Sequence, residues 1–221
     1  MAVIRFEGIP AEAFEFYDDL VADNTRSWWQ AHRATYERAV RDPLTALLAE
    51  LAAEFGAAQV FRPYRDTRFS NDKTPLKDHQ GAFVGVEDAV GYYVQVSRAG
   101  LLVAGGWYSP QGQQVARFRA AIDSGHAAHV RALLAALDRQ GWELDGRPLK
   151  TRPRGVSPDH PDLDLMRMRA LTATHPFPVE PWMGTRKTLQ TVRTRWRQVR
   201  PLVEWLGDQV GPAADPAAPP L

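Results

Sequence analysis

The segment between Arg62 and His79 concentrates side chains that could bind or activate an anion. Cations and carboxylates alternate closely along it, with Arg62, Arg65, Arg68, Lys73, Lys77 and His79 placed among Asp66, Asp72 and Asp78. The planar fork of an arginine suits carboxylate or phosphate oxygens, and a nearby carboxylate or imidazole could carry a proton. These residue types predict either an anion site or a network of charges that neutralise one another.

A strand over residues 61–70 would place these side chains on two faces, because successive side chains of a strand point to opposite sides. The first face would be half-buried and would carry Phe61, Pro63 and Arg65. The second would expose the polar set of Arg62, Tyr64, Asp66, Arg68 and Ser70. Arg65 would then need a partner, since an unpaired buried charge is costly. Pro63 lacks an N–H donor and predicts an edge strand or a bulge.

Two hypotheses of function follow from this segment. In the first, the protein is an enzyme, or at least a binder, for a small molecule that bears phosphate or carboxylate. The anion would be bound by Arg62, Arg65, Arg68, Lys73, Lys77, Tyr92 and Trp107. Asp66 or His160 would be catalytic and move a proton. In the second, the protein is a non-catalytic binding or assembly module whose central charges form an internal structural network.

Neither hypothesis names a reaction, and whether the protein is an enzyme stays open. The sequence contains no HExxH motif, GxxxxGK[ST] loop or GxGxxG loop. His126 and His129 have metal-ligand spacing but no carboxylate in a ligand pattern nearby, so we predict no metal site and identify no cofactor. His160 lies among Asp159, Asp162 and Asp164, where the carboxylates could equally cap the start of a helix.

The central motif resembles the core of the domain of unknown function 2461 family, which consists of conserved hypothetical proteins of bacterial type. The likeness rests on Arg62-x-x-Arg65-Asp66-Thr67-Arg68-Phe69-Ser70-x-Asp72-Lys73-x-Pro75-x-Lys77, with Asn24-Thr25-Arg26-x-Trp28-Trp29 before it and Gly105-Gly106-Trp107-Tyr108-Ser109-Pro110 and Asp159-His160-Pro161 after it. It spans roughly Phe6 to Pro201. Leu76 departs from the family pattern, where an aromatic residue is more frequent. The resemblance implies one compact domain and transfers no catalytic role.

Helix and strand signals frame the central segment. Helices are predicted from Pro10, from the N-cap Thr25, and from Asp42-Pro43 to a stop at Gly56. Strands are predicted at 82–86, 92–97 and 101–108, and Asp145-Gly146 predicts a tight hairpin between 142–144 and 147–149. Ser109 would cap a helix opened by Pro110. A helix with Leu163, Met166 and Leu171 follows, then a last helix from Thr185 to Leu206.

These signals predict an α+β fold, in which an antiparallel sheet of about 4–6 strands is flanked by N-terminal and C-terminal helices. Residues 1–206 would form a single domain, and residues 207–221 a disordered tail rich in proline and alanine. Gly105-Gly106 predicts a bulge, or a place where a ligand or another backbone comes close.

Charge and composition limit the classes of partner. The 221 residues carry a net charge of +1, which argues against a generic nucleic-acid binder. Residues 1–61 hold 5 basic and 10 acidic side chains, whereas residues 147–200 hold 12 basic and 4 acidic ones. An arginine stripe on the last helix could touch phosphates or pair with the acidic N-terminal helices. The absence of cysteine, signal peptide and membrane span favours a cytoplasmic protein. The oligomeric state is open.

Overall fold

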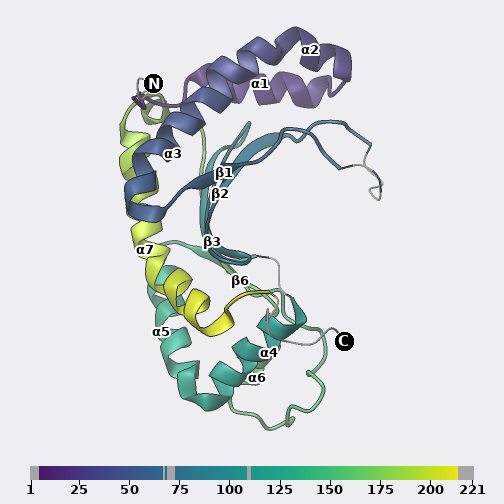
Figure 1. Ribbon diagram of the computed structural model, residues 1–221, viewed down its shortest axis with the longest axis vertical. Helices are drawn as coiled ribbons and strands as arrows, with labels where there is room; N and C mark the ends of the chain where they lie inside the picture. The colour runs from purple at the N-terminus through teal and green to yellow at the C-terminus, as the bar shows by residue number, and fades with distance from the viewer. Residues whose placement is uncertain (1–4, 67, 69–72, 109–110, 214–221) are drawn as a thin grey trace. The chain divides into compact units, whose positions relative to one another are not determined.

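Six strands form one antiparallel sheet in the order β1-β2-β3-β4-β6-β5, which confirms the predicted α+β class (Figure 1). A computed structural model describes residues 5–66, 68, 73–108 and 111–213. The chain divides into two compact units. The first comprises Met1–Val84, Tyr93–Val103 and Pro176–Arg195, and the second comprises Gly85–Tyr92, Ala104–His175 and Trp196–Leu221. The prediction of a single domain over 1–206 stays a prediction.

The first unit begins with three helices that start where the sequence predicts, and the third also ends at the predicted Gly56. Helix α1 spans Ala11–Ala22, α2 spans Arg26–Thr35, and α3 spans Asp42–Phe55. The Thr25 hydroxyl accepts a hydrogen bond from the Trp28 N–H at 3.2 Å and caps α2. Gly56 ends α3 with a φ of 101°, which glycine adopts without a Cβ clash. Between α2 and α3 the chain forms a π-helical segment, η1 (Tyr36–Arg41), which local sequence signals do not reveal.

Aromatic and aliphatic side chains of these helices fill the core of the first unit. Phe16 lies 5.9 Å from Tyr36 between ring centroids, and Trp29 lies 4.7 Å from the same ring. The apolar stripe of α3 is buried, with Leu44, Leu47 and Leu51 among its members. His32 stacks on Trp28 and its Nδ1 contacts the Trp28 carbonyl at 2.8 Å, so this half-buried histidine has a hydrogen-bond partner one helical turn away.

The predicted strand over residues 61–70 is wrong for the residues that the structure describes. Strand β1 covers only Ala58–Val60 and pairs with β2 (His79–Glu87) in the register Gln59↔Phe83. Beyond Val60 the two arms, residues 61–66 and 73–78, meet at a single bridge between Tyr64 and Leu76. The reason lies in Pro63 and Pro75, which have no N–H and interrupt both arms of what we call the 61–78 hairpin. Thr67, Phe69 and Ser70 lie outside the described residues.

The predicted alternation of burial nevertheless holds along residues 61–66. Phe61, Pro63 and Arg65 are half-buried, while Arg62, Tyr64 and Asp66 are exposed. The Arg65 N–H donates to the Pro75 carbonyl at 2.9 Å, and the Lys77 N–H donates to the Pro63 carbonyl at 2.8 Å. These two backbone bonds keep an extended two-faced geometry without a regular strand.

The remaining strands include two that follow the prediction and two that differ from it. Strands β3 (Val90–Ser97) and β4 (Gly100–Trp107) confirm the strands predicted at 92–97 and 101–108. The hairpin predicted at Asp145-Gly146 is wrong, because β5 (Glu143–Asp145) pairs with β6 (Leu171–Phe177) instead. Leu171 therefore begins a strand rather than continuing the short helix α6 (Leu163–Met166).

Helices of the second unit follow the predicted boundaries less closely. Helix α4 spans Gly112–Ala121, η2 Ile122–His126 and α5 Ala127–Asp138, with Gly125 at a φ of 103° between the two α-helices. Gln111 is the N-cap of α4, so this helix starts later than predicted, and Ser109 and Pro110 lie outside the described residues. A Cβ at Gly106 would lie 2.2 Å from the Leu171 carbonyl oxygen, which confirms the predicted close approach of another backbone.

The last helix, α7 (Lys187–Val210), follows a short turn, η3 (Pro181–Gly184), and extends four residues beyond the predicted Leu206. In the first unit, Arg186 pairs with Glu50 at 2.7 Å and Arg193 with Glu54 at 3.6 Å. These contacts confirm that arginines at the start of this helix pair with the acidic N-terminal helices. The tail residues 214–221 lie outside the described part. No helix among the described residues is long and apolar enough to cross a membrane.

Candidate functional site

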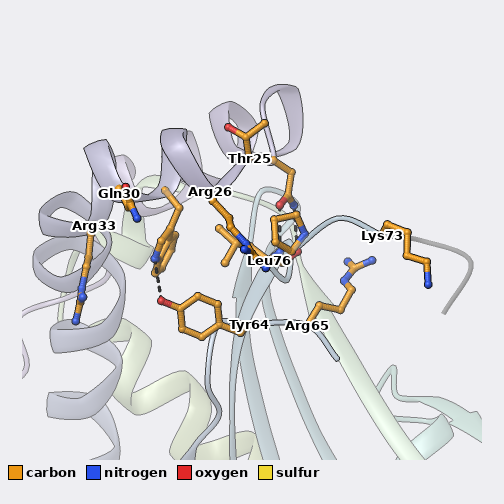
Figure 2. A pocket seen from close by; sticks show the side chains of 11 residues that line it. Thr25, Arg26, Gln30, Arg33, Tyr64, Arg65, Lys73 and Leu76 are labelled. Atoms are coloured by element: carbon orange, nitrogen blue, oxygen red, sulfur yellow. Dashed lines mark hydrogen bonds between the residues drawn. The ribbon is translucent and has the colours of Figure 1, made fainter. Parts of the chain in front are cut away.

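A cavity of about 710 Å³ lies in the first unit between α2 and the 61–78 hairpin (Figure 2). We call it the main pocket. The turn before α2 and α2 itself contribute Asn24, Thr25, Arg26, Trp29, Gln30 and Arg33. The hairpin contributes Tyr64, Arg65, Lys73, Pro75 and Leu76. Segments about 40 residues apart in the sequence thus form its two walls.

The helical wall follows from the spacing of its residues. Arg26, Trp29, Gln30 and Arg33 lie at positions i, i+3, i+4 and i+7 and therefore share one face of α2. Figure 2 shows Arg26, Gln30 and Arg33 extending from the helix on the side of the hairpin. Trp29 is buried, whereas the three polar side chains are exposed. The face thus combines an apolar anchor with exposed donors.

The hairpin wall is fixed by a two-way hydrogen-bonded clamp. The Asn24 side chain donates from Nδ2 to the Leu76 carbonyl at 3.0 Å and accepts the Leu76 N–H on Oδ1 at 3.1 Å. Leu76 itself is only 1% exposed. Because a side-chain amide bonded in both directions cannot rotate freely, the clamp sets the separation of the hairpin arm from the start of α2.

Tyr64 and Trp29 close one side of the main pocket. The Trp29 indole N–H donates to the Tyr64 hydroxyl at 3.2 Å, and their rings meet edge to face with centroids 6.0 Å apart. Tyr64 is exposed although it is large and partly apolar. An exposed aromatic ring held in place by a buried one offers a firm surface to the body of a ligand.

Positive charge dominates the main pocket. Its described lining contains Arg26, Arg33, Arg65 and Lys73, and no carboxylate. Arg33 pairs with Glu37 at 3.1 Å, and Arg65 has Asp78 at 3.8 Å, but Arg26 forms no hydrogen bond or ion pair with another described residue. Near the pocket, burial lowers the pKa of Lys77, and the charges of Arg62 and Arg65 lower it further. Arg62 and Arg65 thus make the potential at Lys77 more positive.

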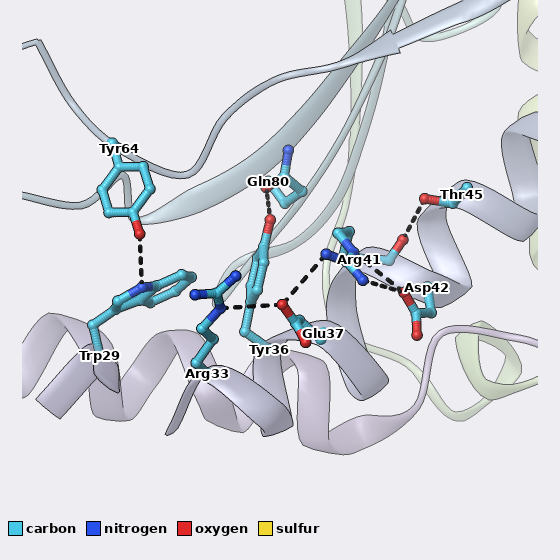
Figure 3. A network of polar contacts seen from close by, with 9 residues as sticks. All are labelled: Trp29, Arg33, Tyr36, Glu37, Arg41, Asp42, Thr45, Tyr64 and Gln80. Atoms are coloured by element: carbon cyan, nitrogen blue, oxygen red, sulfur yellow. Dashed lines mark hydrogen bonds and ion pairs between the residues drawn. The ribbon is translucent and has the colours of Figure 1, made fainter. Parts of the chain in front are cut away.

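A smaller cavity of about 280 Å³, the side cavity, shares Trp29, Arg33 and Tyr64 with the main pocket. Its own lining is drawn from η1, the start of α3 and the hairpin, and includes Tyr36, Glu37, Arg41, Thr45, Phe61 and Arg62. Figure 3 shows the polar contacts along it. The Tyr36 hydroxyl donates to Gln80 Oε1 at 2.6 Å, and Gln80 Nε2 donates to the Phe61 carbonyl at 2.7 Å. This buried chain of bonds anchors the base of the hairpin to η1.

The structure distributes the predicted hairpin residues over several positions. Arg65 and Lys73 line the main pocket, and Arg62 lines the side cavity. The Arg68 side chain donates to Asp66 from Nε at 3.0 Å and from Nη2 at 2.8 Å, and its backbone N–H donates at 3.2 Å. These bonds hold the pKa of the Asp66 carboxyl below its usual value. Neither Arg68 nor Asp66 is among the described lining residues of either cavity.

Lys77 contacts neither cavity in the described lining. Its Nζ lies 5.4 Å from the centroid of the Phe61 ring, a cation–π distance. The Asp66–Arg68 pair is exposed, so the internal charge network of the second hypothesis stays a prediction.

The other three predicted site residues belong to the second unit. Tyr92 is 3% exposed against Trp196, and Trp107 is fully buried against Phe118. His160 Nε2 lies 3.1 Å from Asp123 Oδ1, while its Nδ1 accepts the Asp162 N–H at 3.0 Å. Both ring nitrogens are thus engaged. No cluster of three metal-ligating side chains occurs in the described part of the chain. Roles for these three residues in binding or catalysis stay predictions.

The helical side of the pocket was not assigned from sequence. Asn24 and Arg26 enter the sequence analysis only through the family motif, and Gln30 and Arg33 do not enter it. The usable signal was the polar i, i+4, i+7 spacing of the three helical residues beside a tryptophan. The clamp between Asn24 and Leu76 joins residues 52 positions apart and has no local signature.

Comparison with known proteins identifies one family. The sequence matches the family described as conserved hypothetical protein (DUF2461) over residues 12–205, most of the chain. This match confirms the resemblance of the central motif. No curated protein and no solved structure matches the chain.

Proposed function

Because the chain belongs to the DUF2461 family, to which no activity is assigned, we propose a function from the main pocket itself. The pocket binds a small molecule that bears a phosphate or carboxylate group. The anionic group lies between α2 and the 61–78 hairpin, where Arg26, Arg65 and Lys73 supply donors. The charge and geometry of the pocket support this role.

One observation carries the proposal: four cationic side chains and no carboxylate line the described walls of the main pocket. Hydrogen bonds between cationic donors and an anion are about twice as strong as neutral ones. Arg26 has no partner among the described residues, so binding an anion would not require breaking an existing ion pair at that side chain. Arg26 is therefore the most informative residue to change.

The size and walls of the pocket suit a small organic molecule. Small-molecule sites typically measure about 300–1,000 Å³, and they combine apolar walls with a few polar groups. Here Trp29, Tyr64 and Leu76 supply apolar surface next to the cations. An anionic group with an organic body would use both features, whereas a bare inorganic ion would use only the cations.

At the outer part of the hairpin, by contrast, exposed charges pair with each other. Arg68 neutralises Asp66, and the pairing keeps that carboxylate in its charged form. A carboxylate with a lowered pKa is a weak base near neutral pH. We therefore propose binding at the main pocket. Conversion of the bound molecule, with Asp66 or His160 moving a proton, stays a prediction.

The direct test is a thermal-shift and calorimetry screen with inorganic phosphate, sugar phosphates, nucleotides and dicarboxylates, each against sodium chloride at equal ionic strength. A ligand at about 100 times its dissociation constant should stabilise the protein by ~2.7 kcal/mol. Arg26→Gln should weaken binding by about tenfold, the loss of ~1.4 kcal/mol expected for one charged hydrogen bond.

Arg98→Gln is the matched control for this screen. Arg98 is an exposed arginine at the β3–β4 turn of the same unit, and it lines neither cavity in the described residues. The proposal fails if no compound of the panel stabilises the protein beyond the salt control. It also fails if the Arg26 and Arg98 variants lose affinity equally, because the effect would then reflect net charge alone.

A further inference from the structure

We propose that the ligand carries two separated acidic groups, one held in the main pocket and the other at Arg62 in the side cavity. This inference rests on the proposed function of the main pocket. It adds the chemical class of the ligand: an elongated molecule with an acidic group at each end, such as a bisphosphate, a long dicarboxylate or a phosphorylated acid.

The two cavities adjoin along one wall. Trp29, Arg33 and Tyr64 line both of them, and the Trp29–Tyr64 hydrogen bond holds two of these three side chains together. A molecule that extends past the exposed Tyr64 ring therefore passes from one cavity to the other. Arg33 is accessible from both sides.

Arg62 is the cation that the side cavity offers to a second acidic group. Glu37 already contacts Arg33 at 3.1 Å and Arg41 at 3.4 Å, and Arg41 also contacts Asp42 at 3.2 Å, as Figure 3 shows. Arg62, by contrast, forms no hydrogen bond or ion pair with another described residue. It is exposed and lines this cavity.

The spacing of the cations requires a ligand with separated charges. Arg62 and Arg65 lie on either side of Tyr64 in the hairpin, on its exposed and half-buried faces respectively. Arg62 and Arg65 are three residues apart along an extended arm, which corresponds to about 10 Å of strand rise. A single phosphate can therefore contact one cluster or the other. Two acidic groups separated by a chain on the order of that length can contact both.

The π-helical segment is an independent observation on the same cavity. Tyr36, Glu37 and Arg41, all from η1, line the side cavity. π-Helical turns are rare and occur frequently at functional sites. Glu37, which belongs to this segment, contacts both Arg33 and Arg41 through i, i+4 pairs. The remaining arginine, Arg62, is thereby left for a ligand.

The experiment compares linear alkane α,ω-bisphosphonates, from ethane to decane, with alkyl monophosphonates of equal chain length, by calorimetry on the full chain. We expect an optimal chain length at which the bisphosphonate binds at least about tenfold more tightly than the monophosphonate of equal length. Once the first phosphonate group is bound, the chain holds the second group near Arg62 at a high effective concentration. Arg62→Gln should remove this advantage and leave monophosphonate affinity unchanged. Arg62→Lys should retain part of it, and Arg98→Gln all of it.

Two outcomes would overturn the inference, and they are distinguishable. If monophosphonates bind but bisphosphonates bind no better at any length, the side cavity takes no second acidic group and the main pocket keeps its proposed role. The same conclusion follows if Arg62→Gln weakens both series equally. If neither series binds and the wider panel also fails, the proposed function falls together with the inference. Melting temperatures of the Arg62 variants separate lost binding from lost folding.

Discussion

The hydrogen bond from Tyr36 to Gln80 gives the sharpest prediction about what holds the hairpin base. The two side chains are 4% and 1% exposed, and the bond measures 2.6 Å. Gln80 Nε2 donates to the carbonyls of Phe61 and Gly81 at 2.7 and 2.9 Å, so the amide is held in one orientation. Burial raises the pKa of Tyr36 to about 12, which keeps the hydroxyl protonated and donating at neutral pH.

Tyr36→Phe should destabilise the protein by about 2 kcal/mol, within the ~1–3 kcal/mol cost of a buried polar group left without its partner. The aromatic ring remains, so its contact with Trp29 at 4.7 Å is kept and no large cavity forms. The loss is therefore that of the donor alone.

Tyr93→Phe is the matched control. Its hydroxyl donates to Gln95 Oε1 at 2.8 Å, but Gln95 is only half-buried and water can replace the lost donor. The expected loss is about 0.5–1 kcal/mol. Urea unfolding, followed by tryptophan fluorescence, would measure the free energy of unfolding of both variants. The two values are compared with the same dependence of that free energy on urea concentration. A loss for Tyr93→Phe equal to or larger than that for Tyr36→Phe would refute the reasoning.

Three further predictions follow from particular contacts. Asn24→Ala removes both bonds of the clamp and should cost about 1–3 kcal/mol in urea unfolding and weaken ligand binding; unchanged values for both would contradict the clamp. Arg186 lowers the pKa of Glu50 from its ordinary 4.5 to about 2. The stabilisation by this carboxylate should be complete above pH 4.5 and disappear as the pH falls toward 2. Glu50→Gln should therefore show a shallower loss of stability over that interval, and equal slopes would speak against the pair. Gly106→Ala places a Cβ against a carbonyl at a φ of 134°, so it should destabilise by at least about 1–3 kcal/mol, whereas Gly112→Ala, where the added methyl meets no atom within 4 Å, should be neutral or stabilising.

Features set by local chemistry could be predicted from the sequence. Thr25 and Gly56 mark helix ends because capping and left-handed geometry are properties of single residues. The alternation of burial from Phe61 to Asp66 follows from the two-residue period of extended backbone. The tendency of arginines near α7 to pair with acidic helices followed from charge asymmetry alone.

Features set by distant partners could not be predicted. The strand expected over residues 61–70 fails because Pro75, on the opposite arm, interrupts the same pairing that Pro63 weakens. The hairpin expected at Asp145 fails because β6 offers that strand another partner. The pocket depends on Asn24 meeting Leu76 across 52 residues, a tertiary contact that no local period encodes. Arg26 lines the pocket only because the fold brings the hairpin opposite α2.

The central claim, that the main pocket binds a small anion, is tested most directly at the Trp29 indole. The chain has seven tryptophans, and Trp29 donates its indole N–H to Tyr64 at the edge of the pocket. In a titration with the ligand of the panel that binds most tightly, followed by NMR, the signal of the Trp29 indole N–H should shift. The dissociation constant from this shift should equal the one measured by calorimetry. The signals of Trp142 and Trp196, both buried in the second unit, serve as internal references. Binding that leaves the Trp29 signal unmoved, or that moves the reference signals instead, would contradict the assignment of the pocket.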